Sequence, residues 1–170
     1  MKTCCDVLIS VTNDDINSDG TFTFPSGIEI INASAFKGCA NLKKINIPDS
    51  VKRIDNHAFF GCENLEEVVI PEGVTCIEEY TFACCAKLRS VYIPKTVTDI
   101  YLGAFENCFS LERVVIPGNI EYISCYTFLG CFYLKAVIFE ETIDEYTKLY
   151  LTPPYYLTPI IKKGDVDNES

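Results

Sequence analysis

The stretch PDSVKRIDNHAFFGCENLEEVVI, from Pro48 to Ile70, decides the fold because its pattern returns before and after it at a spacing of 23 residues. Proline opens the successive units, in the column Pro25, Pro48, Pro71, Pro94 and Pro117, and Glu140 follows at the next step. A fixed period of this length predicts a solenoid, in which each unit is one coil that buries its apolar residues against its neighbours.

The apolar residues recur in the same columns of each unit, numbered here from 1 at the proline. In the quoted unit they are Val51, Ile54, Phe59, Cys62, Leu65, Val68 and Ile70. The segment Leu-x-x-Val-x-Ile predicts a short strand with positions 21 and 23 facing the core and positions 20 and 22 facing solvent, because side chains alternate along a strand. Val-x-x-Ile predicts a second extended edge. Ala-Phe-x-Gly-Cys predicts a helical or tight turn, with a left-handed or closely packed backbone at Gly38, Gly61 and Gly130.

These segments, between Pro25 and Phe139, resemble the BspA-like class of 23-residue leucine-rich repeats over about two thirds of the chain. The resemblance implies an α+β repeat solenoid, a right-handed leucine-rich-repeat coil with a parallel β-sheet on one face. It also implies a surface or interaction role, because the family is known mainly from such proteins of host-associated bacteria and parasitic protists.

The pattern divides the chain into four segments. We expect a capping hairpin over residues 1–24, five full repeats over 25–139, a degenerate capping repeat over 140–163 and a disordered acidic tail over 164–170. The hairpin is expected to join the apolar run Val7 to Val11 with the alternating segment Gly20 to Pro25, because turn-forming residues separate them. In the degenerate repeat Pro153 and Pro154 replace the Gly-Cys pair. The segment Pro153 to Tyr156 is interpreted as a cap, with a WW-domain ligand as the alternative.

Composition narrows the classes of partner. The 170 residues are 48% hydrophobic with a formal net charge of -10, which predicts one acidic domain that repels nucleic-acid phosphates. No apolar run approaches the roughly 18 residues of a membrane span, and the N-terminus has no signal-peptide pattern. We therefore expect no nucleic-acid partner, no membrane insertion and a cytoplasmic location. A cell-surface location is expected if the sequence is a fragment or is exported by a non-standard route.

The ten cysteines are expected to be reduced, because no export pattern accompanies them. Five share position 15 and are expected to be buried as small hydrophobic residues: Cys39, Cys62, Cys85, Cys108 and Cys131. Disulfides between column neighbours are the alternative, since a spacing of about 4.8 Å lies within their range. The other five are oxidation targets where they are exposed: Cys4, Cys5, Cys76, Cys84 and Cys125.

Sequence motifs for catalysis or cofactor binding are lacking. No Cys-x-x-Cys pair occurs, so neither a metal site nor a cofactor is expected. The single histidine, His57, occupies a variable turn position, and only proximity in sequence supports a catalytic pairing with Cys62 or a nearby serine. The chain is therefore not expected to be an enzyme.

Position 22, which faces outward from the strand, defines the candidate site. Four consecutive coils place Val69, Tyr92, Val115 and Ile138 there, although the coil does not require apolar residues at this position. Glu67, Ser90 and Arg113 at position 20 are predicted to form part of the rim, and apolar strips with polar rims are typical of interaction surfaces.

We predict a non-enzymatic module that binds a protein partner through this sheet face. The alternative function is a cell-surface adhesin or antigen fragment of a host-associated microbe. The apolar strip could also be covered by the chain's own tail, or could be a generic β-rich face.

Two further patterns concern the surface. Position 19 alternates in charge, with Lys43, Glu66, Arg89, Glu112 and Lys135, which predicts opposite charges on neighbouring strands.

The later coils carry an excess of apolar residues: Tyr101, Leu102, Phe109, Tyr122, Tyr126, Leu129, Phe132 and Tyr133. This C-terminal apolar surface is expected either to be covered by tyrosines of the C-terminal segment or to favour self-association.

Overall fold

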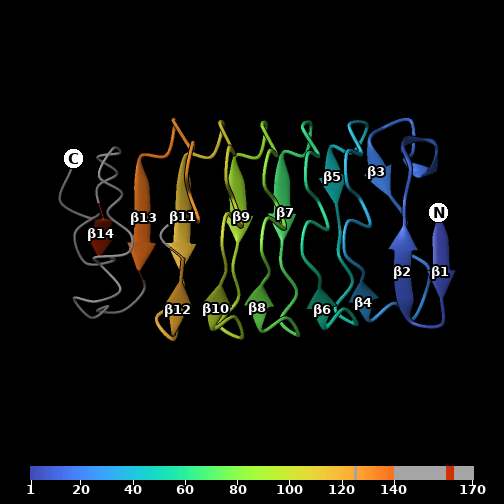
Figure 1. The fold of residues 1–170 in the computed structure, drawn as a ribbon, viewed down its shortest axis with the longest axis horizontal. Helices are drawn as coiled ribbons and strands as arrows, with labels where there is room; N and C mark the ends of the chain where they lie inside the picture. The colour runs from blue at the N-terminus through green and yellow to red at the C-terminus, as the bar shows by residue number, and fades with distance from the viewer. Residues whose placement is uncertain (125, 140–159, 163–170) are drawn as a thin grey trace.

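The computed structural model describes residues 1–124 and 126–139 and the backbone of the strand at 160–162. The coils stack one after another along a single axis, with the N-terminus at one end of the stack (Figure 1). Most of the predicted degenerate repeat over 140–163, and the whole predicted tail over 164–170, lie outside the described residues.

One row of parallel strands derives from the Leu-x-x-Val-x-Ile segments. Its members, in order along the stack, are β3 (Thr21–Phe22), β5 (Lys44–Ile45), β7 (Glu67–Val69), β9 (Ser90–Tyr92), β11 (Arg113–Ile116), β13 (Ala136–Phe139) and β14 (Ile160–Lys162) (Figure 1). The row comprises two hydrogen-bonded sheets, β3-β5-β7-β9 and β11-β13-β14, whose strands pair in the register of the repeat, with Val69 opposite Tyr92 and Val137 opposite Ile160. The predicted parallel sheet is therefore confirmed.

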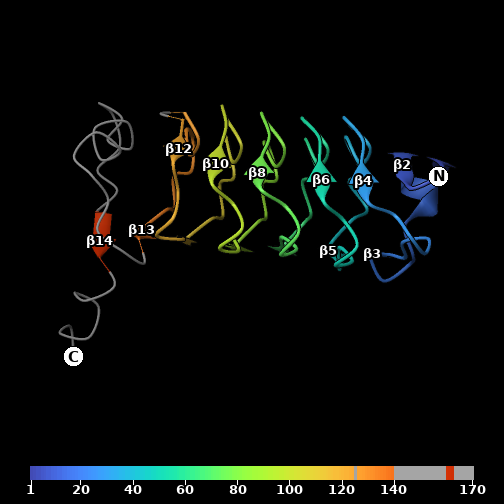
Figure 2. The same ribbon diagram turned by 90° about the horizontal axis from the view of Figure 1, so that it is seen from below.

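A second row of short strands comes from the Val-x-x-Ile segments, which the sequence identified only as an extended edge. It contains β2 (Val7–Ser10), β4 (Ile30–Ile31), β6 (Arg53–Ile54), β8 (Cys76–Ile77), β10 (Asp99–Ile100) and β12 (Tyr122–Ile123). Its inter-coil pairs are also parallel. The strands of this row lie along a different side of the stack from β3, β5 and β13 (Figure 2). Each coil is thus bounded by parallel strands on two sides rather than one.

The Ala-Phe-x-Gly-Cys segments form tight turns. The only helix in the described residues is the 3-10 helix η1 (Asn13–Asp15), so the α+β description is not confirmed there. Backbone dihedrals explain this, because position 14 has a positive φ in five coils: Gly38, Gly61, Cys84, Asn107 and Gly130. Position 10 is also left-handed at Ser34, His57, Tyr80 and Gly103. A left-handed residue ends a right-handed helix, so left-handed residues at positions 10 and 14 leave no room for a helix between them.

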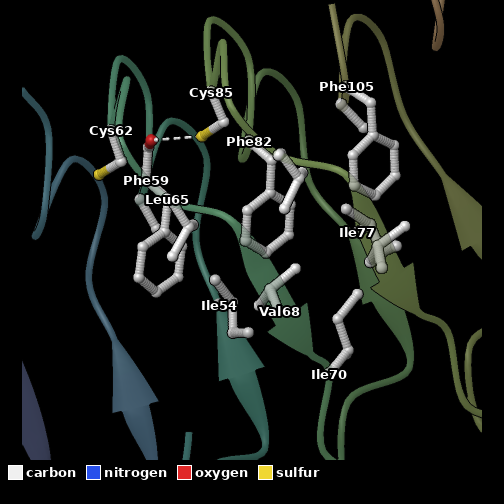
Figure 3. Packing of buried hydrophobic residues seen from close by; sticks show 14 of the residues in the cluster. Ile54, Phe59, Cys62, Leu65, Val68, Ile70, Ile77, Phe82, Cys85 and Phe105 are labelled. Carbon is white, nitrogen blue, oxygen red and sulfur yellow. Dashed lines mark hydrogen bonds between the residues drawn. The ribbon is translucent and has the colours of Figure 1, made fainter. Parts of the chain in front are cut away.

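The inward columns form one continuous core. Phe36, Phe59, Phe82 and Phe105 are fully buried, and their rings stack coil upon coil with centroids 4.8 to 5.5 Å apart. Figure 3 shows three members of this stack, Phe59, Phe82 and Phe105. Such spacings lie within the favourable range for stacked aromatic rings.

The position-15 cysteines lie beside this stack, and all five are free and buried. Each of the later four thiols donates a hydrogen bond to a phenylalanine carbonyl of the preceding coil, as Cys85 does to Phe59 at 3.3 Å (Figure 3). The prediction of unpaired core thiols is confirmed for this column, and the disulfide alternative is not found there.

The N-terminal segment departs from the predicted hairpin. Val7–Ser10 pairs antiparallel with β1 (Lys2–Cys4), whereas Thr21–Phe22 pairs in parallel with β5. The predicted pairing between these two segments was wrong because both already match the repeat, with Leu8 opposite Ile31 and Phe22 opposite Ile45. Each therefore gains inter-coil hydrogen bonds and a buried side chain by stacking on the first full repeat.

Replacing Gly38 with Ala should lower the free energy of unfolding by about 1 kcal/mol, because an alanine is strained in the left-handed region. An added Cβ meets no atom within 4 Å, so the effect reports the backbone conformation alone. Gly38→Asn should cost less, since asparagine tolerates this conformation and Asn107 adopts it in a later coil. Urea unfolding of the three proteins measures the difference, and equal stability of the Ala and Asn variants would contradict the assignment.

A brief exposure of the native, reduced protein to iodoacetamide should leave the five position-15 cysteines unmodified, because their side chains are buried. The exposed Cys4 and Cys5 should be alkylated in the same pulse and serve as the internal control. A second label added after denaturation, read by peptide mass spectrometry, counts the protected thiols. Modification of Cys85 at the rate of Cys4 would show that the column is not packed as described.

Candidate protein-interaction surface

Three neighbouring strands present an exposed apolar row on the sheet face. Val69, Tyr92 and Val115 are 59%, 53% and 37% exposed, whereas the residues before them in each strand are buried. The row is contiguous, because Val69 lies opposite Tyr92 in the parallel register and β11 lies next to β9 in the stack (Figure 1). We call this row, with its rim residues, the sheet-face strip. The predicted exposure of its first three members is confirmed.

The strip borders two shallow grooves. The first, of about 240 Å³, is lined by Glu67, Val68, Val69, Ser90, Val91, Tyr92, Ile93, Lys95, Val115 and Pro117. The second, of about 270 Å³, continues toward the N-terminus along β3 and β5 and shares Glu67 and Val69 with the first. The sheet face therefore carries a continuous uneven surface from β3 to β11.

The rim combines charges of both signs. Glu67, Ser90 and Arg113 are exposed as predicted, and Lys44 lies opposite Glu67 in the sheet. Beyond the strip, the Lys135 ammonium lies 2.8 Å from a Glu112 carboxylate oxygen, and its hydrogen bond lowers the pKa of Glu112. The predicted alternation at position 19 thus produces an ion pair at this step. Because both side chains are exposed, the pair contributes little to stability and mainly shapes the charge of the face.

Ile138 does not belong to the exposed row. Its side chain is 2% exposed, and all four residues of β13 are buried, so both faces of this strand are covered. The sequence predicted exposure from the strand alternation, which assumes that the outward face is open. That assumption fails at β13, which is also followed by β14 on its far side.

Three residues that border the strip were not predicted from the sequence. Lys95 and Pro117 line the first groove, and Glu72 accepts a hydrogen bond from the Tyr92 hydroxyl at 3.4 Å. All three occupy position 1 or 2, directly after the strand of the preceding unit. The repeat pattern could have identified these residues, because positions 1 and 2 follow the strand directly and stay near the sheet face to which position 22 belongs.

The C-terminal apolar surface is largely exposed. Exposure exceeds 40% for Phe109, Tyr122, Tyr126, Phe132 and Tyr133, while Tyr101, Leu102 and Leu129 are half-buried. The rings of Phe109 and Phe132 stack at 5.7 Å. Self-association through this surface stays a prediction.

The candidate catalytic pair does not have the properties of a nucleophile and its base. Cys62 is fully buried, its thiol donates to the Phe36 carbonyl, and burial raises its pKa well above the usual range. A protonated thiol of this kind is a poor nucleophile. The His57 ring instead packs 5.1 Å from the Tyr80 ring and 5.6 Å from that of Phe60.

Metal and membrane sites were sought over the same described residues. Nowhere in residues 1–124 and 126–139 do three or more His, Cys, Asp or Glu side chains converge as metal ligands would. Within the described part of the chain, no helix combines the length and apolar character needed to cross a membrane.

Comparison with known proteins identifies one family. Residues 17–149 match the family described as BspA type leucine rich repeat region, in six copies. No match was found among the curated proteins.

Several solved structures have the same fold. A leucine rich cell surface protein from Faecalibacterium prausnitzii shares 33% identity at a TM-score of 0.72, over 75% of this chain and 34% of that one. The leucine rich repeat protein of T. pallidum shares 31% identity at a TM-score of 0.67, over 70% and 58%. A leucine-rich repeat protein from Eubacterium ventriosum shares 29% identity at a TM-score of 0.71, over 78% and 35%. The chain thus spans from a third to somewhat over half of these proteins.

Proposed function

Because the chain belongs to the BspA-type leucine-rich repeat family, we propose that it is a non-enzymatic module that binds a protein partner through its sheet-face strip. The observation that carries this proposal is the exposed row of Val69, Tyr92 and Val115. The coil does not require apolar residues at this position, since earlier coils place Thr23 and Asn46 there. Exposed apolar side chains that packing does not need are typical of interaction surfaces.

The composition of the strip fits a protein partner. Tyr92 lies between two valines, and Arg113 lies on the rim of the same face. Tyrosine and arginine are among the residues that most often dominate the energy of protein interfaces. The grooves are shallow and open onto a continuous face, whereas a small-molecule site usually encloses most of its ligand.

Replacing Tyr92 and Val115 together with Asp should weaken partner capture by at least about 30-fold, because two carboxylates would be placed in the apolar centre of the contact. The measurement is an affinity pull-down from extracts of cells that carry this protein, with binding of each captured protein then titrated against purified chain. Both side chains project from the solvent face of the sheet, so the fold and the circular dichroism spectrum should not change.

The matched control is the pair Tyr122→Asp and Tyr126→Asp, which changes two tyrosines of similar exposure outside the sheet-face strip. This variant should capture the partner as well as the native chain does. Equal capture by all three proteins would reject the strip as the binding site, and loss with the control alone would move the site to the C-terminal apolar surface.

A second candidate is a role as a cell-surface adhesin or antigen. It is supported by the similarity to the Faecalibacterium prausnitzii structure, which is described as a leucine rich cell surface protein. Under this hypothesis the partner of the sheet-face strip lies outside the cell. Under the alternative of a cytoplasmic location, the partner lies inside.

Labelling intact cells with a membrane-impermeant amine reagent separates these locations. A surface protein should be labelled at its exposed lysines, such as Lys43 and Lys44, before lysis. A cytoplasmic protein should be labelled there only after lysis. A known cytoplasmic protein of the same cells provides the control for leakage.

A further inference from the structure

The chain contains two Cys-Cys dipeptides, and the fold treats them differently. Cys4 and Cys5 lie at the turn between β1 and β2, both are exposed, and their sulfur atoms are 3.9 Å apart. Cys84 and Cys85 lie in the turn of a later coil, where Cys84 is half-buried and Cys85 is buried.

The backbone conformation of the hairpin explains the contact between the first two thiols. Neighbouring side chains of an extended strand point to opposite sides, but Cys5 has a φ of 54°, which turns the chain out of the strand immediately after Cys4. The next residue, Asp6, accepts backbone hydrogen bonds from Glu29 at 2.8 Å and Ile30 at 3.2 Å. The turn is therefore held against the first full repeat while its two thiols face solvent.

The second dipeptide shows that sequence adjacency is not sufficient. Cys84 also has a positive φ, yet the Cys85 thiol lies in the core and donates a hydrogen bond to the Phe59 carbonyl at 3.3 Å. Burial raises the pKa of Cys85, so its reactive thiolate is disfavoured. Of these two dipeptides, only Cys4 and Cys5 present both thiols to an oxidant in solvent.

We propose that Cys4 and Cys5 form a redox-active vicinal dithiol, which closes reversibly to a disulfide by exchange with a small-molecule disulfide. One thiolate attacks a sulfur of the small disulfide, whose sulfur–sulfur bond breaks and releases one small thiol. The neighbouring thiolate then attacks the mixed disulfide, which forms the Cys4–Cys5 bond and releases the second small thiol. The protein loses two electrons and two protons, and the small disulfide gains them as two thiols.

The closed form is expected to be readily reduced. Adjacent Cα atoms are about 3.8 Å apart, shorter than the roughly 4.4 to 6.8 Å that most disulfides span. Strained and exposed disulfides have the more oxidising potentials, and these bonds open again when conditions become reducing. The two thiols contact each other before oxidation, with either sulfur able to donate, and this contact raises the pKa of Cys5 because it favours the protonated Cys5 thiol. The pair therefore acts as a reversible redox site on the edge hairpin, independent of the sheet-face strip.

The experiment equilibrates the folded chain in buffers that range from reduced to oxidised glutathione, followed by acid quenching, alkylation under denaturing conditions and tryptic digestion. Cleavage after Lys2 and Lys37 yields the peptide of residues 3–37, in which Cys4 and Cys5 are the only cysteines. In oxidising buffers this peptide should lose two hydrogens and resist alkylation, and dithiothreitol should restore both alkylation sites. The ratio of disulfide to dithiol should exceed that of Cys84 and Cys85 by at least about tenfold in the same buffer.

Single variants and the unfolded chain complete the test. Cys4→Ser and Cys5→Ser should each stop at a glutathione mixed disulfide, because the second thiol is missing. In urea the two Cys-Cys dipeptides should become similar, since the fold no longer separates them. The proposal is overturned if the native peptide 3–37 keeps two glutathiones without closing, stays reduced throughout, or closes no more readily than the Cys84 and Cys85 pair in the folded chain.

Discussion

Hydrogen bonds between successive coils are the interaction on which the structure depends. The Phe36 amide donates to the Ala58 carbonyl at 2.7 Å, Phe59 donates to Thr81 at 2.9 Å, and Phe82 donates to Ala104 at 2.9 Å. The amides at positions 10 and 14 donate in the same way to the residue just before the equivalent position of the next coil, as Ser34 does to Asn56 and Gly38 to Phe60, so even the turns are bonded to the next coil. A single coil would leave these buried backbone groups unpaired, which is costly, and stacking is therefore obligatory.

This constraint determines which side chains are free to vary. The inward columns must fill the space between coils, and the left-handed positions must allow a positive φ. Position 22 contributes to neither requirement in β7, β9 and β11, because its side chains there leave the sheet on the solvent side. Packing of the coil therefore does not require apolar residues at Val69, Tyr92 and Val115, and this is the physical basis of the proposal that the binding function lies there.

The columns that the coil requires were predicted correctly from the sequence, whereas the turns and the outward positions were predicted less well. The burial of Phe59, Cys62 and Leu65 was predictable, because each recurs at a fixed step and a repeating coil can place such a column only inward. The tight turns were less predictable, since a helix and a turn share the same apolar spacing. They are decided by dihedral angles that Cys84 and Asn107 adopt without being glycine. Exposure at position 22 followed from strand alternation, but alternation does not show what covers a strand, and Ile138 was misplaced for that reason.

By itself, the sequence determined the period, the parallel stacking, the inward columns and the candidate face, because a repeat imposes the same local environment on every copy. Only the tertiary structure decided where that environment is interrupted. Val7–Ser10 and Thr21–Phe22 join two different rows instead of pairing with each other, because inter-coil hydrogen bonds are available to both. The two Cys-Cys dipeptides are identical in sequence, yet Cys4 and Cys5 are both exposed whereas Cys85 is buried and Cys84 half-buried. Burial differs because it depends on contacts with residues that are distant in the sequence.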